Sequence, residues 1–321
     1  MEPVGPSPWH NPNTGDAVRP RWETGFNVEG VLRDFRDGDE QMQRVKAAGF
    51  NLPVVSYVQL DGLNLYYKDE AAMRAAGFDD YSRFIRTVFA AIQTHADAAG
   101  WLPVYWNLGD EPIGDDLRRA AENAEAYRAA VPAGPPFFTA ATSFTGDKAD
   151  DPHFRFARAL HVANLNLHDE ACVGLLRGAG AGWAFYNGGN RWTYGTYMYK
   201  AAKEFDMKFR LSWHWNVVAG DPYYALDCRE DDYAWCNASP NGELIPSLHF
   251  EREIREGVDD YRYLLTLARL ADQKQDAAAK ALIRSRLDAF RLGQRDHDAL
   301  FPAGDWRDFR RQLAEAIERL R

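Results

Sequence analysis

The sequence is poor in cysteine, and the few cysteines that it has do not suit a disulfide framework. Its 321 residues contain three, Cys172, Cys228 and Cys236, which is an odd and sparse set. Cys228 and Cys236 could pair with each other, but they give only a weak signal for zinc, because no histidine is clustered with them. We therefore expect three ordinary thiols.

Long apolar runs and a surplus of positive charge are absent as well. No stretch of about 18 uninterrupted apolar residues occurs, so nothing in the sequence predicts a membrane span. The formal net charge is −9, whereas a surface for nucleic acid or for an anionic membrane needs a basic patch. We expect neither nucleic acid nor a membrane as a partner.

The first part of the chain, residues 1–20, lacks the cationic and apolar pattern of a secretion signal. This segment is rich in Pro, Gly and Asn, which is typical of an extended lead-in. The chain as written is therefore expected to be cytoplasmic. A secreted precursor whose signal peptide has been removed would fit the same sequence.

Apolar and aromatic residues are what the sequence has in quantity. Apolar residues make up 46% of the chain and charged residues 26%, which is enough for a large packed core. An α/β barrel takes about 250 residues, and this length leaves room for a helical appendage. The 10 Trp, 15 Tyr and 18 Phe are an excess that suits the flat apolar faces of sugar rings.

Helical and strand-like segments alternate along the chain. Helical patterns cover 38–48, 81–99, 117–130, 170–176 and 193–205, and strand-like runs cover 52–60, 102–108, 137–144, 160–167, 182–186 and 209–218. This order favours parallel βαβ units. With a weaker first strand at 26–32, it predicts a (β/α)8 TIM-type barrel over 21–272. The charged, Ala-rich pattern that follows predicts a C-terminal helical extension over 273–321.

Two adjacent carboxylates, Asp110 and Glu111, follow an apolar and aromatic strand-like run. In a barrel of this kind, the chemistry is carried out at the C-terminal ends of the strands. Pro112 disfavours the helical region for the residue before it, so we expect Glu111 to stay extended. The alternative is that one carboxylate caps the next helix, but Asp115 is the better N-cap.

A carboxyl pair suits the cleavage of a glycosidic bond, which needs a proton on the leaving oxygen. An ionised carboxylate beside a carboxylic acid raises the pKa of the acid toward neutrality. Successive strand residues point to opposite faces, however, so Asp110 and Glu111 cannot easily flank one sugar. A doublet on one strand better suits a reaction in which an acetamido group of the substrate is the nucleophile.

Three segments carry a family resemblance. They are WNLGDEP at 106–112; WAFYN at 183–187 with Arg191, Tyr194-Gly195 and WHW at 213–215; and IPSL at 245–248 leading into Glu251, IREG at 254–257 and DDY at 259–261. In this order they resemble the catalytic barrel of glycoside hydrolase family 123 and the related DUF4091 proteins. Members of the family carry a β-rich domain before the barrel, which has almost no counterpart here.

The resemblance implies a (β/α)8 barrel that releases β-linked N-acetylgalactosamine, or another N-acetylhexosamine, with retention by substrate-assisted catalysis. At the matching doublet, Glu111 would be the general acid/base. Asp110 would orient the acetamido nitrogen and stabilise the oxazolinium-like intermediate. The implied partner is a carbohydrate substrate, either a small molecule or a glycan.

Polar and aromatic residues at or near the ends of predicted strands, together with Trp235 in the loop after Asp231 and Asp232, are the candidates for contact with that carbohydrate. They are Tyr57, Trp106, Asn107, Asn164, His168, Tyr186, Asn187, Arg191, Trp213, Trp215 and Trp235. Trp213 and Trp215 alternate along one strand, so only one of them is expected to face the site. For Asn187 and Arg191 the alternative is a network that fixes a loop. No metal and no cofactor are expected, because nothing in the sequence converges on the polar cluster around His168.

Two other interpretations stay open. A conventional two-carboxylate glycosidase acting on a sugar without an acetamido group would need a separate nucleophile, for which Glu251 and Glu253 are candidates. Their position at the start of a helix equally suits a charge role at the helix N-terminus. The other alternative is a barrel that binds carbohydrate without cleaving it.

Overall fold

A computed structural model describes residues 35–293 and 305–321, with gaps at 52, 57–69, 133–136, 145–150, 167, 187–189, 212–235, 239–240, 242, 249 and 289. The described residues divide between two compact units. The first lies within Met1–Leu165 and Gly174–Gly182, and the second within Asn166–Val173 and Trp183–Arg321.

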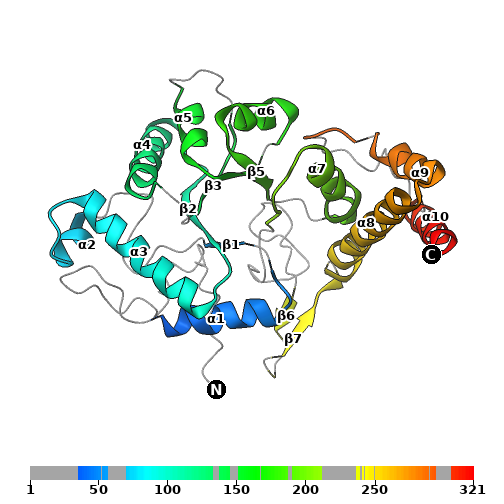
Figure 1. The fold of residues 1–321 in the computed structure, drawn as a ribbon, viewed down its shortest axis with the longest axis horizontal. Helices are drawn as coiled ribbons and strands as arrows, with labels where there is room; N and C mark the ends of the chain where they lie inside the picture. Colours follow the sequence, from blue (N-terminus) through cyan, green and yellow to red (C-terminus); the bar gives the residue numbers. More distant parts are fainter. Residues whose placement is uncertain are drawn as a thin grey trace. The chain divides into compact units, whose positions relative to one another are not determined.

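A parallel sheet forms the centre of the first unit (Figure 1). Its strands, in spatial order, are β1 (Val54–Ser56), β2 (Val104–Asp110), β3 (Phe137–Thr142) and β4 (Val162–Leu165). Helix α1 (Arg36–Ala47) precedes β1, and the connections contain α2 (Glu70–Ala75), α3 (Tyr81–Ala99), α4 (Gly114–Ala130) and α5 (Pro152–Ala159). Because parallel strands can be joined only by a crossover, a helix after each strand produces this order.

The two faces of this sheet carry different side chains. Trp106 and Phe138 point toward α3, where the ring centroid of Phe89 lies 6.1 Å from Trp106 and 5.8 Å from Phe138. Tyr105 and Phe137 come one residue earlier on the same two strands, and their ring centroids lie 4.9 Å apart. Since strand residues alternate, Tyr105 and Phe137 belong to the opposite face. We call that face of the sheet, defined by Tyr105 and Phe137, the inner face.

The second unit is mainly helical. Strand β5 (Gly182–Phe185) begins at the last residue of the first unit, and α6 (Glu170–Ala179) precedes it. The elements that follow are η2 (Thr193–Tyr197), α7 (Met198–Glu204), β6 (Cys236–Ala238), β7 (Leu244–Pro246), η3 (Phe250–Arg255), α8 (Glu256–Lys274), α9 (Ala277–Leu287) and α10 (Asp305–Leu320). Leu264 and Leu267 of α8 share one hydrophobic cluster with Ile283 of α9 and Leu313 of α10. The predicted helical extension therefore packs onto α8.

The structure confirms the α/β prediction and most of its elements. Helix α3 has the predicted bounds, because the Asp80 side chain caps its N-terminus and Gly100, at φ +65°, ends it. Strands β1 to β4 are parallel, as the alternation predicts. The predicted strand at 26–32 and nearly all of that at 209–218 lie outside the described residues. The closed eight-stranded barrel therefore stays a prediction.

Two helices and a hairpin are additions to the predicted elements. Helix α5 carries a local signal, since the Asp151 side chain accepts the His153 N–H and Pro152 occupies the first turn. Helix α2 and the antiparallel pair β6–β7 also form. The prediction that Asp115 is an N-cap is wrong: the N-cap of α4 is Ile113, and Asp115 lies in the first turn. Its charge still faces the positive end of the helix dipole.

Candidate functional site

The acidic doublet lies at the C-terminal edge of the parallel sheet. Asp110 is the last residue of β2, Glu111 follows it directly, and both residues are exposed. In α/β folds, ligands bind at this edge of the sheet. The doublet therefore lies where the sequence predicts it.

A bulge in β2 decides to which face of the sheet Asp110 belongs. Asn107 pairs with Thr139 and Asp110 pairs with Ala141, so three steps along β2 match two steps along β3. After three regular strand steps, the side chains of Asn107 and Asp110 would point to opposite faces of the sheet. The extra residue of the bulge removes one of these alternations, so the two side chains point to the same face. Asp110 therefore belongs to the inner face, together with Asn107. The predicted strand has no bulge, although Gly109 inside a strand-like run is a signal for one.

Asn164 of β4 lies in the same row of the sheet as Asp110. Ala141 pairs with Asp110 on one side and with Asn164 on the other. Two strand spacings of about 4.8 Å separate the two backbones. Asn164 is fully buried. The structure thus brings three predicted site residues, Asn107, Asp110 and Asn164, to one face near the strand ends.

Glu111 does not stay extended, which corrects the prediction from Pro112. Its φ is +49°, in the left-handed region. The chain leaves the sheet edge here and enters α4 three residues later, and this reversal overrides the preference of a residue before proline. A residue other than glycine costs about 1–2 kcal/mol in this conformation. Backbone strain of this kind clusters at active sites.

Two oxygens on the inner face have no hydrogen-bond partner within the described part of the chain. They are Oδ1 of Asn107 and Oγ1 of Thr139. Thr139 is 1% exposed, whereas Asn107 is only half-buried. On the same face, burial raises the pKa of the Tyr105 phenol above its ordinary value. Before the row of Asp110, the inner face therefore carries the aromatic rings of Tyr105 and Phe137 and the neutral polar side chains of Asn107 and Thr139.

The remaining predicted contact residues have mixed placements. Trp106 is 2% exposed and packs on Phe89, so it belongs to the core layer between β2 and α3 and is turned away from the inner face. Tyr186 is half-buried directly after β5. Five of them lie outside the described residues: Tyr57, Asn187, Trp213, Trp215 and Trp235.

His168, in the second unit, is packed among aromatic rings. It stacks on Phe185 at 4.7 Å between ring centroids and meets Tyr197 edge-on at 5.6 Å. Its Nδ1 lies 3.4 Å from the carbonyl oxygen of Asn166. His168 is half-buried, and these contacts give it a packing role among aromatic rings.

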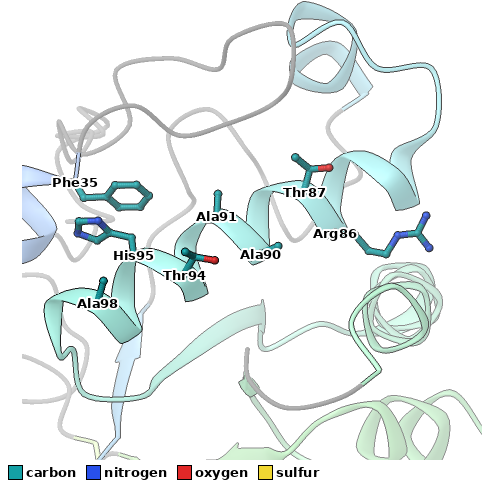
Figure 2. A pocket seen from close by; sticks show the side chains of 8 residues that line it. All are labelled: Phe35, Arg86, Thr87, Ala90, Ala91, Thr94, His95 and Ala98. Carbon is teal, nitrogen blue, oxygen red and sulfur yellow. The ribbon is translucent and has the colours of Figure 1, made fainter.

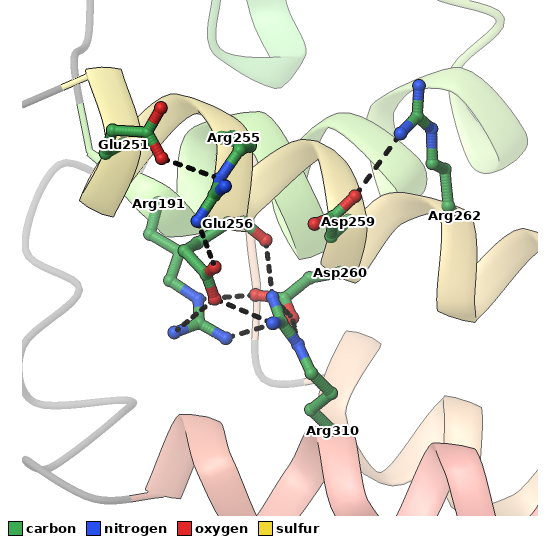
Figure 3. Close-up of polar contacts among 8 residues, drawn as sticks. All are labelled: Arg191, Glu251, Arg255, Glu256, Asp259, Asp260, Arg262 and Arg310. Atoms are coloured by element: carbon green, nitrogen blue, oxygen red, sulfur yellow. Dashed lines mark hydrogen bonds and ion pairs between the residues drawn. The ribbon is translucent and has the colours of Figure 1, made fainter. Parts of the chain in front are cut away.

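Arg191 belongs to a network of ion pairs (Figure 3). Its guanidinium donates to both carboxylate oxygens of Asp260, at 2.6 and 3.0 Å, and its backbone N–H donates to Glu253 Oε2 at 2.7 Å. Arg310 donates to Asp260 and to Glu256, each at 2.6 Å. Asp260 is only 2% exposed. These bonds favour the loop-fixing interpretation of Arg191 over contact with a sugar.

A shallow groove follows the side of α3 that faces away from the sheet (Figure 2). Phe35, His95, Arg86 and small side chains of α3 line it. His95 Nε2 lies 2.8 Å from Asp39 Oδ1, which also accepts the Trp101 indole N–H at 2.7 Å. Phe35 stacks on His95 at 4.0 Å between ring centroids. These contacts tie α1 to α3, which is a structural role.

The described part of the chain holds neither a cluster of metal ligands nor a membrane-spanning helix. No group of three or more His, Cys, Asp or Glu side chains there is placed to hold a metal ion. No helix among these residues is long and apolar enough to cross a bilayer. Cys172 is buried and is not part of a disulfide bond.

Comparison of the chain with models of known protein families finds no match, and no curated protein matches it either. The resemblance to glycoside hydrolase family 123 stays a prediction, carried by the three segments quoted above.

Proposed function

We propose that the chain is a retaining glycoside hydrolase that releases β-linked N-acetylgalactosamine, or another N-acetylhexosamine, by substrate-assisted catalysis. Glu111 donates a proton to the leaving oxygen and afterwards takes one from the attacking water. Asp110 accepts the acetamido N–H while the acetamido carbonyl oxygen attacks the anomeric carbon. Water then opens the resulting oxazolinium, and the configuration is retained.

The observation that carries the proposal is the break in strand geometry at the doublet. On a regular strand, neighbouring carboxylates point to opposite faces and cannot easily flank one sugar. Here the bulge puts Asp110 on the inner face. Glu111, the residue after it, has a left-handed φ and so lies outside the strand. Both residues are exposed at the edge where α/β enzymes bind their substrates.

A conventional mechanism with Glu251 or Glu253 as nucleophile has less support. The carboxylate of Glu251 pairs with Arg255 at 2.9 Å, and that of Glu253 accepts the Arg191 N–H at 2.7 Å. Each carboxylate therefore has a structural role that explains its presence without a role as nucleophile. We therefore keep a conventional glycosidase as an outcome of the test.

The experiment is hydrolysis of a chromogenic β-N-acetylgalactosaminide and of the matching β-galactoside. The wild type should cleave only the acetamido sugar, and Glu111→Gln should lower kcat by about 10²–10⁴-fold, the usual contribution of a general acid. Glu122→Gln, the same change at an exposed position of α4, is the matched control and should leave the rate unchanged.

Three results would overturn the proposal in different ways. Cleavage of the plain galactoside would indicate a separate nucleophile and a conventional mechanism. Failure of a thiazoline mimic of the oxazoline to inhibit would remove substrate assistance. Binding of the sugar without turnover, in the wild type and in Glu111→Gln alike, would identify a carbohydrate-binding protein.

A further inference from the structure

Two neighbouring oxygens on the inner face, Oδ1 of Asn107 and Oγ1 of Thr139, have no hydrogen-bond partner among the residues that the structure describes. Asn107 and Thr139 lie directly opposite each other in the pairing of β2 with β3, so their side chains leave the sheet side by side. Both oxygens are buried, and neither has a hydrogen-bond partner among the described residues. Nearly all buried polar atoms in native proteins are paired, so two unpaired neighbours need an explanation.

Their position relative to Asp110 suggests what that explanation is. The bulge leaves two regular strand steps between Asn107 and Asp110, or about 7 Å along β2. One sugar ring bound at Asp110 spans that distance. The Asn107 side chain is half-buried and Thr139 is 1% exposed, so a ligand approaches from the Asn107 side and must displace what covers the two buried oxygens.

The chemistry of the two atoms limits the group that they accept. An amide oxygen only accepts hydrogen bonds, whereas a threonine hydroxyl both donates and accepts. A ligand hydroxyl fits both, because it can donate to Asn107 and accept from Thr139. A carboxylate or phosphate oxygen fits badly, since it would face the lone pairs of the Asn107 oxygen. We infer that Asn107 and Thr139 form a subsite for one hydroxyl group of the substrate sugar. This inference rests on the proposed function, which supplies the sugar.

The first test needs no ligand. Thr139→Val keeps the shape of the side chain and removes only the hydroxyl. If that hydroxyl is unpaired in the free protein, the melting temperature should stay the same or rise. The matched control is Thr193→Val, at another buried threonine whose hydroxyl donates to the Asn190 side chain. Loss of that bond should lower the melting temperature by about 2 °C.

The second test is calorimetric titration with N-acetylgalactosamine. Thr139→Val should weaken binding about 5-fold, the loss expected for one neutral hydrogen bond, and Thr139→Ser should restore it. Unchanged affinity in Thr139→Val would overturn the subsite while leaving the proposed function intact. A drop in melting temperature as large as that of Thr193→Val would overturn it too, because the hydroxyl would then have a partner within the protein. A wild type that neither binds nor cleaves the sugar would overturn the proposed function, and the subsite with it.

Discussion

Gly257 of α8 lies so close to the backbone of Arg191 that no β-carbon fits between them. A Cβ at position 257 would lie 2.4 Å from the Arg191 carbonyl oxygen and 2.6 Å from the Cβ of Tyr194. Asp260, one helical turn further along α8, accepts the guanidinium of the same Arg191. The close approach at Gly257 and the ion pair at Asp260 therefore depend on one another.

Gly257→Ala should destabilise the protein. Alanine normally stabilises a helix relative to glycine by up to about 1 kcal/mol, but here the overlap with Arg191 forces the backbones apart. We expect a loss of about 1–3 kcal/mol in the free energy of unfolding, measured by urea denaturation. Gly174→Ala in α6, where nothing lies within 4 Å, is the matched control and should be neutral or stabilising. Equal effects of the two substitutions would contradict the close approach.

Asp260→Asn should cost far more than the same change at its neighbour Asp259. Asp260 is 2% exposed and bonds to both Arg191 and Arg310, and its neutralisation leaves these two half-buried guanidiniums with Glu256 as their remaining acidic partner among the described residues (Figure 3). Breaking a buried pair costs about 3–5 kcal/mol, and the remaining contacts with Glu256 place the expected loss at the lower end of that range. Asp259 pairs, within the described part of the chain, only with the exposed Arg262, a type of contact worth about 0–1 kcal/mol. Chemical denaturation of both variants makes the comparison, and similar losses would contradict a central role for Asp260.

Glu111→Gly should be more stable than Glu111→Ala. At φ +49° alanine retains the steric cost of the left-handed conformation, whereas glycine does not. We expect a difference of about 1 kcal/mol between the two variants in urea denaturation. Both lack the carboxylate, so the comparison isolates the backbone from the chemistry. Equal stability would mean that position 111 does not adopt this conformation.

The free energy of unfolding should decrease as the pH is lowered from about 6.5 to 4, because of His161. Burial, and then the charge of Arg128, lower the pKa of His161 to about 4. The ordinary pKa of histidine is 6.5, so as the pH falls through this value His161 becomes protonated in the unfolded chain but stays neutral in the folded protein. The contribution of His161 is therefore fully present above pH 6.5 and lost toward pH 4.

His161→Gln should remove this part of the pH dependence. The free energy of unfolding of wild type and variant, measured at several values between pH 4 and 7, should converge toward the acid end. An unchanged slope in the variant would show that His161 titrates alike in the folded and unfolded chain.

Local signals in the sequence were sufficient to predict the elements and the place of the acidic doublet. Asp80 and Gly100 bound α3 because a cap and a left-handed glycine act within one helical turn. Asp276 starts α9 in the same way, through a 2.7 Å bond from the Ala279 N–H. The apolar run before Asp110 likewise predicts a strand that ends at the doublet.

The sequence by itself determined this alternation of helices and strands, because periodicity and capping operate over a few neighbouring residues. Only the tertiary structure decided the face of Asp110, the left-handed turn at Glu111 and the structural bonds of Arg191. Strand register depends on pairing with β3, and Arg191 meets a carboxylate 69 residues away along the chain. Such contacts exist only when distant segments pack, so no pattern of neighbouring residues encodes them.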